Sequence, residues 1–193
     1  MIFTQTDLLR QTITVLEQLR IRYLICGSFA SATFGEPRMT LDIDIVVQLT
    51  QSEGEGLCRE FPAPDFYVSL AAAREAISGR RRFNVIHPET GNKVDFMVAG
   101  DDEWSQSQVD RAHRTELLPG VSGLVSSPED VVISKMRYYQ EGGSEKHLRD
   151  CAGVLTIQRE RVDRSYIVRW AAHFGLLEIW EAILQRVSDN DQH

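Results

Sequence analysis

Two aspartates, Asp42 and Asp44, are separated by a single residue within an apolar run that continues to Val47. Side chains alternate across a β-strand, so both carboxylates share one face while Ile43 and Ile45 point to the other. Two like charges this close repel each other and are costly to remove from water. A divalent cation would offset that cost, and Mg²⁺ is often held by carboxylates together with substrate phosphates. The pair predicts a metal site; the alternative is an edge strand with two solvated aspartates.

The chain before this pair has the pattern of a strand, a turn and a short helix. The apolar run 23–26 predicts a buried strand, Gly27 and Ser28 break it, and the small residues 30–33 predict a helix that ends at 35–37. Backbone N–H groups at such a turn, together with the Ser28 hydroxyl, suit the docking of phosphates. The strand that carries the two aspartates would then bring its carboxylates beside those phosphates.

A third acidic residue, Asp95, lies in the middle of another predicted strand. The apolar runs 83–87 and 93–98 flank a segment, 88–92, whose Pro, Thr, Gly and Asn are typical of a turn. This pattern predicts an antiparallel hairpin. An aspartate inside a buried strand needs a partner or a metal; the alternative is an edge-strand aspartate with its carboxylate in solvent.

The polar and small residues of this region follow a known signature, carried by Gly27, Ser28, Gly35, Arg38, Thr40, Asp42 and Asp44. They resemble the DNA polymerase beta-type nucleotidyltransferase superfamily. The resemblance is closest to a small bacterial branch that includes AbiEii-like toxins and aminoglycoside nucleotidyltransferases, and it extends to about residue 150. It implies an α/β (α+β) fold with a short mixed, mainly antiparallel sheet flanked by helices, and a C-terminal helical cap.

The resemblance also implies a reaction and its ligands. A metal-dependent nucleotidyltransferase moves a nucleoside monophosphate from an NTP, its co-substrate, to a hydroxyl or phosphate acceptor. Asp42, Asp44 and Asp95 are the implied catalytic residues and would hold two Mg²⁺ ions. The implied nucleotide-binding residues are Gly27, Ser28, Arg38, Thr40 and Lys135.

Lys135 belongs to a second stretch that resembles the end of the catalytic region in AbiEii-like proteins. There Ser127 and Pro128 predict a helix start, and Asp150 matches a later acid of that branch. The second acid of the branch is missing, because position 153 is Gly. An ion pair with Lys146 is the plain alternative role for Asp150.

The acceptor stays open among a small molecule, a tRNA and a protein. The resemblance implies a toxin–antitoxin or abortive-infection component, with a cognate antitoxin or toxin protein as a possible partner. A non-catalytic nucleotide-binding or antitoxin-partner module on the same fold is an alternative function, and a plain globular protein is a third. The run Arg80–Arg82 predicts either a solvated loop or a contact to a triphosphate or RNA.

Bulk properties agree with an intracellular enzyme. The chain has 193 residues and a net charge of −7, which argues against broad nucleic-acid binding. Its three cysteines form no disulfide or zinc pattern, and no apolar run is long enough to span a membrane, so a cytoplasmic location is expected. The predicted organisation is a catalytic core over 1–126 and a helical region over 127–193. Trp104 is expected in a polar linker as a packing lid.

Overall fold

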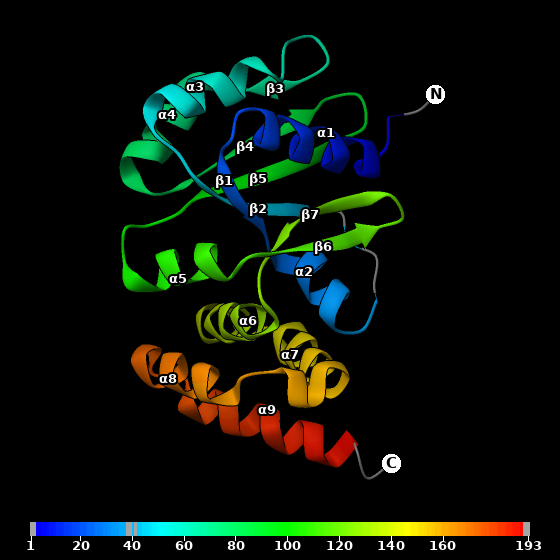
Figure 1. Cartoon of the computed structure of the whole chain (residues 1–193), viewed down its shortest axis with the longest axis vertical. Coiled ribbons are helices and arrows are strands. Elements are labelled where there is room, and N and C mark those ends of the chain that lie inside the picture. Colours follow the sequence, from blue (N-terminus) through cyan, green and yellow to red (C-terminus); the bar gives the residue numbers. More distant parts are fainter. Residues whose placement is uncertain (1–2, 38–39, 41, 191–193) are drawn as a thin grey trace. The chain divides into compact units, whose positions relative to one another are not determined.

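The computed structural model describes residues 3–37, 40 and 42–190 (Figure 1). The described residues fall into two compact units. One contains residues up to Phe29 and from Thr40 to Val125, and the other contains the described part of 30–39 and the residues from Ser126 onward. The segment that follows Phe29 therefore belongs with the C-terminal helices.

A mixed sheet forms the centre of the first unit. In the part of the chain that the structure describes it has seven strands in the order β3-β4-β5-β2-β1-β7-β6. The strands are β1 (Arg22–Ile25), β2 (Asp42–Gln48), β3 (Tyr67–Val68), β4 (Arg82–His87), β5 (Asn92–Val98), β6 (His113–Leu118) and β7 (Val121–Val125). The pairs β2–β5 and β1–β7 are parallel and the others are antiparallel, which confirms the predicted fold class.

Three helices cover one face of this sheet: α1 (Gln5–Gln18), α3 (Gln51–Arg59) and α4 (Leu70–Gly79). Their apolar residues share a core with every second residue of the central strands, including Ile43, Ile45 and Phe96, all fully buried. The period of two predicted from the sequence is therefore the period of burial. Thr4 caps α1 by accepting a hydrogen bond from the backbone N–H of Asp7.

The opposite face of the sheet carries a smaller apolar cluster beside α5 (Glu103–Arg111). Val109 of this helix packs with Leu24, and Val46 and Met97 pack against them. The prediction that Trp104 lies in a polar linker is wrong, because the residue is buried in α5. The Asp102 side chain caps the helix through the N–H of Ser105, 3.0 Å away.

The second unit is helical and runs from yellow to red in Figure 1. It contains α6 (Pro128–Gly142), α7 (Glu145–Gln158), the short turn η1 (Arg159–Arg161), α8 (Arg164–Phe174) and α9 (Leu177–Asn190). Helix α2 (Gly27–Phe34) begins in the first unit, and its residues from Ala30 onward belong to the second. There the Gln158 side chain donates to the Phe34 carbonyl at 2.8 Å. Among the described helices, none is long and apolar enough to cross a membrane.

Candidate active site

The register of two neighbouring strands brings Asp44 and Asp95 side by side. Strands β2 and β5 pair in parallel with Asp44 opposite Asp95 and Asp42 opposite Lys93. Neighbouring strands lie about 4.8 Å apart, and all four side chains leave the sheet on the face opposite the buried Ile43. Both strands lie inside the sheet, since β5 lies between β4 and β2, and β2 between β5 and β1. The edge-strand alternatives for these aspartates are therefore wrong.

Lys93 links two of the carboxylates, although the sequence motif gives it no role. Its Nζ donates to Asp95 Oδ2 at 2.6 Å and lies 3.5 Å from Asp42 Oδ1. The hydrogen bond to Asp95 raises the pKa of Lys93, and the charges of Asp95 and Asp42 add to the effect. The partner that a half-buried aspartate requires is thus a lysine. The sequence could have predicted this contact, because Lys93 lies two residues before Asp95 and therefore on the same face of the strand.

The donor chemistry on this face fits a divalent cation, since adjacent carboxylate oxygens are the ligands that Mg²⁺ prefers. Among the described residues, however, no group of three or more His, Cys, Asp or Glu side chains is arranged to hold a metal ion. The ion pair of Lys93 with Asp95 occupies one Asp95 oxygen, Oδ2. A cation that binds this oxygen would compete with the ammonium group.

Gly27, the first residue of α2, lies directly against Asp44. Its φ is +61°, and a Cβ at this position would be 2.1 Å from Asp44 Oδ2. The neighbouring Cys26 N–H donates to the Asp44 carbonyl at 2.9 Å, which ties the start of α2 to β2. The first-turn N–H groups of an α-helix have no acceptor within the helix. Gly27 and Ser28 therefore begin a helix whose electropositive end lies next to a carboxylate.

The other predicted nucleotide-binding residues differ in how they are placed. Arg38 lies outside the described residues. The Thr40 hydroxyl donates to the Asp42 carbonyl at 3.4 Å, a contact that holds the chain where it enters β2.

Lys135 lies in the second unit, on α6, and is almost completely buried. Its Nζ donates to Asp150 Oδ2 on α7 at 2.7 Å, and the Ser31 hydroxyl lies 3.5 Å from the same oxygen. A buried charge requires such a partner. Asp150 therefore pairs with Lys135. Lys146 was the alternative partner expected from the sequence.

No family model and no curated protein matches the chain. Solved structures do match it. A crystal structure of ANT(2'')-Ia in complex with adenylyl-2''-tobramycin superposes with a TM-score of 0.59 and 14% identity, covering 88% of this chain and 96% of the other. A solution structure of the antibiotic-resistance factor ANT(2'')-Ia covers 100% of both chains with a TM-score of 0.56 and 18% identity. At these identities the likeness shows the fold.

Proposed function

We propose that this chain, which has the fold of the DNA polymerase beta-type nucleotidyltransferases, transfers a nucleoside monophosphate from an NTP to a hydroxyl or phosphate acceptor. The acceptor oxygen forms a bond to the α-phosphorus, and the bond from that phosphorus to the oxygen of the β-phosphate breaks. Pyrophosphate leaves, and an acceptor hydroxyl gives up its proton. The observation that carries the proposal is the pairing of Asp44 with Asp95 across parallel strands, with the start of α2 against Asp44.

Each carboxylate has a role in this proposal. Asp42, Asp44 and Asp95 would hold two Mg²⁺ ions, which would supply positive charge to the reacting phosphate and acceptor oxygens. Asp95 also takes the proton of an acceptor hydroxyl, since it lies one strand away from the Asp42–Asp44 pair. Lys93 offsets part of the charge of Asp95 and Asp42, and its ammonium group would be available to phosphate oxygens that reach the same face.

The nucleotide is held by the turn before α2 and by nearby polar groups. Gly27 lets the backbone approach the triphosphate because it carries no side chain, and Ser28 contributes its hydroxyl and N–H. Thr40 lies where the chain enters β2, and Arg38 is assigned to the nucleotide by the resemblance alone. Lys135, in the second unit, is assigned to the phosphates by the resemblance alone, and its ammonium group donates a hydrogen bond to Asp150.

A cytoplasmic location, where NTP and Mg²⁺ are abundant, suits this activity. A toxin–antitoxin role with a cognate protein partner rests on the resemblance to AbiEii-like toxins. A non-catalytic nucleotide-binding or antitoxin-partner module is the second candidate. The specific observation in its favour is the Lys93–Asp95 ion pair, which neutralises a carboxylate that catalysis would need.

The decisive experiment incubates the protein with each NTP, labelled at the α-phosphate, in the presence of Mg²⁺ and total cell extract. We expect label in one class of acceptor and release of pyrophosphate, both lost in Asp44→Asn. The variant keeps the size and shape of the side chain, so its melting temperature tests folding separately. If wild-type protein labels nothing with any NTP while nucleotide still binds, the non-catalytic module is the better description.

A further inference from the structure

A basic hollow of about 490 Å³ opens in the first unit at the junction of α4 and β4. It is lined by the three consecutive arginines Arg80, Arg81 and Arg82, together with Met97 and Val98 of the neighbouring strand β5. Backbone hydrogen bonds fix this corner, since the Arg81 N–H donates to the Ala76 carbonyl at 2.9 Å and the Val98 N–H donates to the Arg81 carbonyl at 3.0 Å. These bonds hold the backbone of the arginine run in place between α4 and β4.

The three arginines are not equivalent. Arg80 donates from Nη2 to both carboxylate oxygens of Asp101 at 2.7 Å, so its charge is offset. Among the described residues, no carboxylate pairs with Arg81 or Arg82, and both side chains are exposed. The hollow thus presents two guanidinium groups without a matching anion. A guanidinium group is planar and can donate two parallel hydrogen bonds to a phosphate group, a bidentate geometry that favours phosphate as the ligand.

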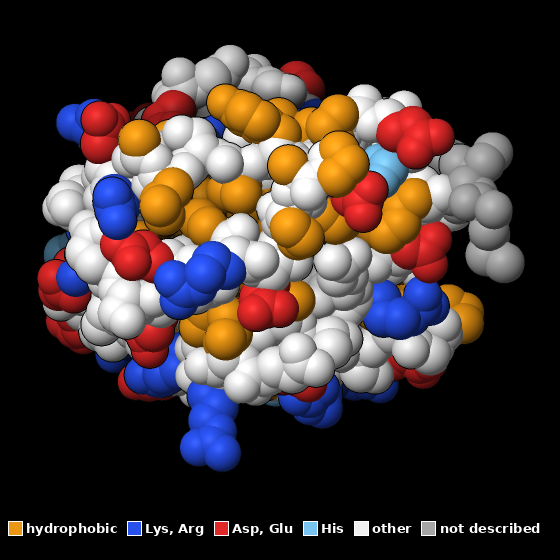
Figure 2. All heavy atoms as spheres, turned by 90° about the horizontal axis from the view of Figure 1, so that it is seen from above, with side chains coloured by type: hydrophobic (Ala, Val, Ile, Leu, Met, Phe, Trp, Pro, Cys, Tyr) orange, Lys and Arg blue, Asp and Glu red, His pale blue; other side chains and the backbone are white. Residues whose placement is uncertain are grey.

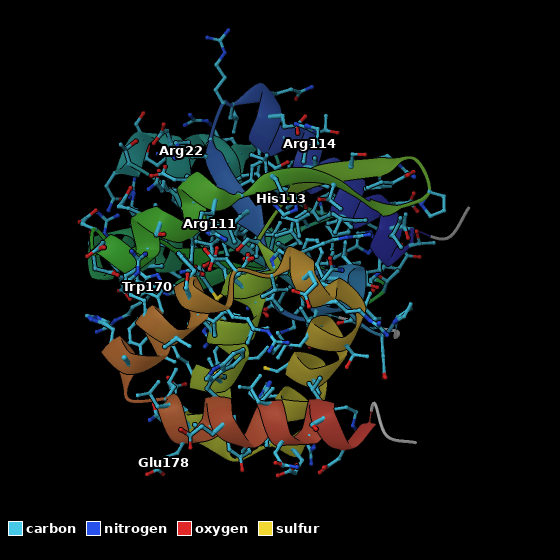
Figure 3. The ribbon with its side chains drawn as sticks, turned by 60° about the horizontal axis from the view of Figure 1, so that its bottom comes forward. Arg22, Arg111, His113, Arg114, Trp170 and Glu178 are labelled. Atoms are coloured by element: carbon cyan, nitrogen blue, oxygen red, sulfur yellow. The ribbon has the colours of Figure 1, made fainter. Side chains whose placement is uncertain are left out.

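Several other cations of this unit are used in ion pairs. Arg22 and Arg114, labelled in Figure 3, pair with Asp110 at 2.5 Å and with Glu17 at 2.6 Å. The other hollow described in this unit is apolar and lies around Phe61 and Phe66, at the end that Figure 2 shows from above with hydrophobic side chains among charged ones. Of these two hollows, the one at Arg81 and Arg82 has a lining of three arginines and no acidic side chain, so it is the better suited to an anion.

The position of the hollow relates it to Asp95. In the β4–β5 ladder Arg82 stands opposite Met97, and Asn84 stands opposite Asp95. Arg82 and Asn84 are two residues apart, so they lie on the same face of the sheet as Asp95, with Arg82 one row away at roughly 7 Å. The hollow lies on the β4 side of Asp95, whereas Gly27 and the start of α2 lie beyond β2 on the other side.

We infer that Arg81 and Arg82 bind a phosphate group carried by the acceptor, and that the acceptor is therefore an anionic, phosphate-bearing molecule. The inference rests on the proposed function, because it takes Asp95 as the group that meets the acceptor hydroxyl. A phosphate at Arg82 and a hydroxyl at Asp95 are one row apart, a separation that one phosphorylated sugar spans. A polycationic acceptor such as an aminoglycoside is repelled by the same two arginines. The phosphate can belong to the end of an RNA strand or to a small phosphorylated metabolite.

The test measures binding without NTP or Mg²⁺, so that its outcome does not depend on transfer. The probes are a short fluorescent single-stranded RNA with a free 3′ hydroxyl, a nucleoside monophosphate as competitor, and a labelled aminoglycoside. The variant Arg81→Gln/Arg82→Gln is compared with Arg10→Gln/Arg59→Gln. The control removes the same charge from α1 and α3, which cover the opposite face of the sheet.

We expect the Arg81→Gln/Arg82→Gln variant to bind phosphate-bearing probes about tenfold or more weakly, as for the loss of charge-assisted hydrogen bonds. For RNA, the log–log salt slope should become shallower by roughly 1.4, because each neutralised phosphate of a single strand contributes about −0.7. The control should keep the wild-type affinity and slope. If the nucleoside monophosphate competes, and its binding is weakened by the same two substitutions, the acceptor is a small phosphorylated molecule. If RNA binds and the monophosphate does not compete, the acceptor is an RNA strand.

Two results would overturn the inference. One is an equal loss of affinity in both double variants, which would show that only the net charge of the protein affects binding. The other is tight aminoglycoside binding that the arginine changes leave unaltered. In the second case the proposed nucleotidyl transfer still stands if label from NTP reaches the aminoglycoside.

Discussion

The carboxylate of Asp44 fills the space in which a side chain of residue 27 would begin. A Cβ at Gly27 would be 2.1 Å from Asp44 Oδ2 and 2.8 Å from its Cγ. Real Cβ atoms do not approach other heavy atoms so closely, so any other residue must push Asp44 aside. The backbone adds a second demand, because the φ of +61° at Gly27 is one that side chains of L-residues rarely adopt.

We therefore predict that Gly27→Ala lowers the rate of nucleotidyl transfer by about 100-fold or more, since displacement of a reacting group by about 1 Å is enough for such a loss. Gly120→Ala is the matched control. Its φ of +72° imposes a similar backbone strain, but nothing lies within 4 Å of the added Cβ. Rates and melting temperatures of both variants are to be compared. A Gly27→Ala protein no more impaired than the control would show that contact with Asp44 is unimportant.

Lys93 should compete with metal ions for the carboxylates. Its ammonium is 2.6 Å from Asp95 Oδ2 and 3.5 Å from Asp42 Oδ1, so a cation bound at these oxygens competes with it. Replacement by Met removes the competitor and one positive charge. We expect Lys93→Met to bind Mn²⁺ in the absence of nucleotide about tenfold more tightly, or ~1.4 kcal/mol, in a calorimetric titration. Lys146→Met makes the same charge change in the second unit and should leave the affinity unaltered; equal gains in both would count against direct competition.

Tyr23 should make the protein sensitive to alkali. Its hydroxyl donates to Glu17 Oε1 at 3.1 Å and accepts from the Leu124 N–H at 3.3 Å, and burial raises the pKa of Tyr23 to about 12. The side chain ionises near pH 10 when unfolded, so the unfolded state gains stability relative to the folded state as pH rises from about 10 to 12. The urea midpoint should fall over that range, and less steeply in Tyr23→Phe.

The matched control for this titration is Tyr67→Phe, because the Tyr67 side chain is 59% exposed. It should retain the wild-type slope. The pKa of Lys93 is also raised, by its hydrogen bond to Asp95. Its contribution is likewise present at neutral pH and lost above its own pKa, so some slope should persist in Tyr23→Phe. A wild-type slope in Tyr23→Phe would show that this hydroxyl does not control the transition.

The buried pair of Lys135 and Asp150 allows a test between a structural and a phosphate-binding role. Removing one member leaves an uncompensated buried charge, so Lys135→Met should destabilise the protein by about 3–5 kcal/mol in urea denaturation. The double change to Met at Lys135 and Leu at Asp150 should recover most of that loss. If Lys135 binds the triphosphate, the double variant will be stable yet raise the KM for NTP. A stable double variant with wild-type KM would confine the pair to structure.

Much of the site follows from alternation alone. The spacing of Asp42 and Asp44 predicts a shared face, the burial of Ile43 confirms it, and the hairpin around residues 88–92 places Asp95 in a neighbouring strand. The pairing of Asp44 with Asp95 does not follow, because β2 and β5 are joined through a long crossover. Their parallel register is set by the packing of the whole sheet rather than by local residues.

The sequence did not predict helix α5 or the role of Lys93, for different reasons. Helix α5 has few apolar positions, mainly Trp104 and Val109, so its sequence lacks a clear stripe and its start depends on the Asp102 cap. Lys93 fitted the strand pattern, but its side chain is positively charged, whereas the motif consists of negatively charged aspartates. Its contact with Asp95 lies within one strand and follows from the alternation, but its 3.5 Å distance to Asp42 joins two strands, and no pattern within one strand encodes that contact.

The carboxylates stand on two interior strands, and this determines how long the site lasts. Each of β2 and β5 is hydrogen-bonded to a neighbour on both sides, so neither can peel away from an edge. Backbone amides in the middle of β2 and β5 meet solvent only when the sheet opens, and such openings of a core sheet are rare. Frayed ends and cut loops would leave the carboxylates aligned. The lifetime of the site is therefore that of the sheet.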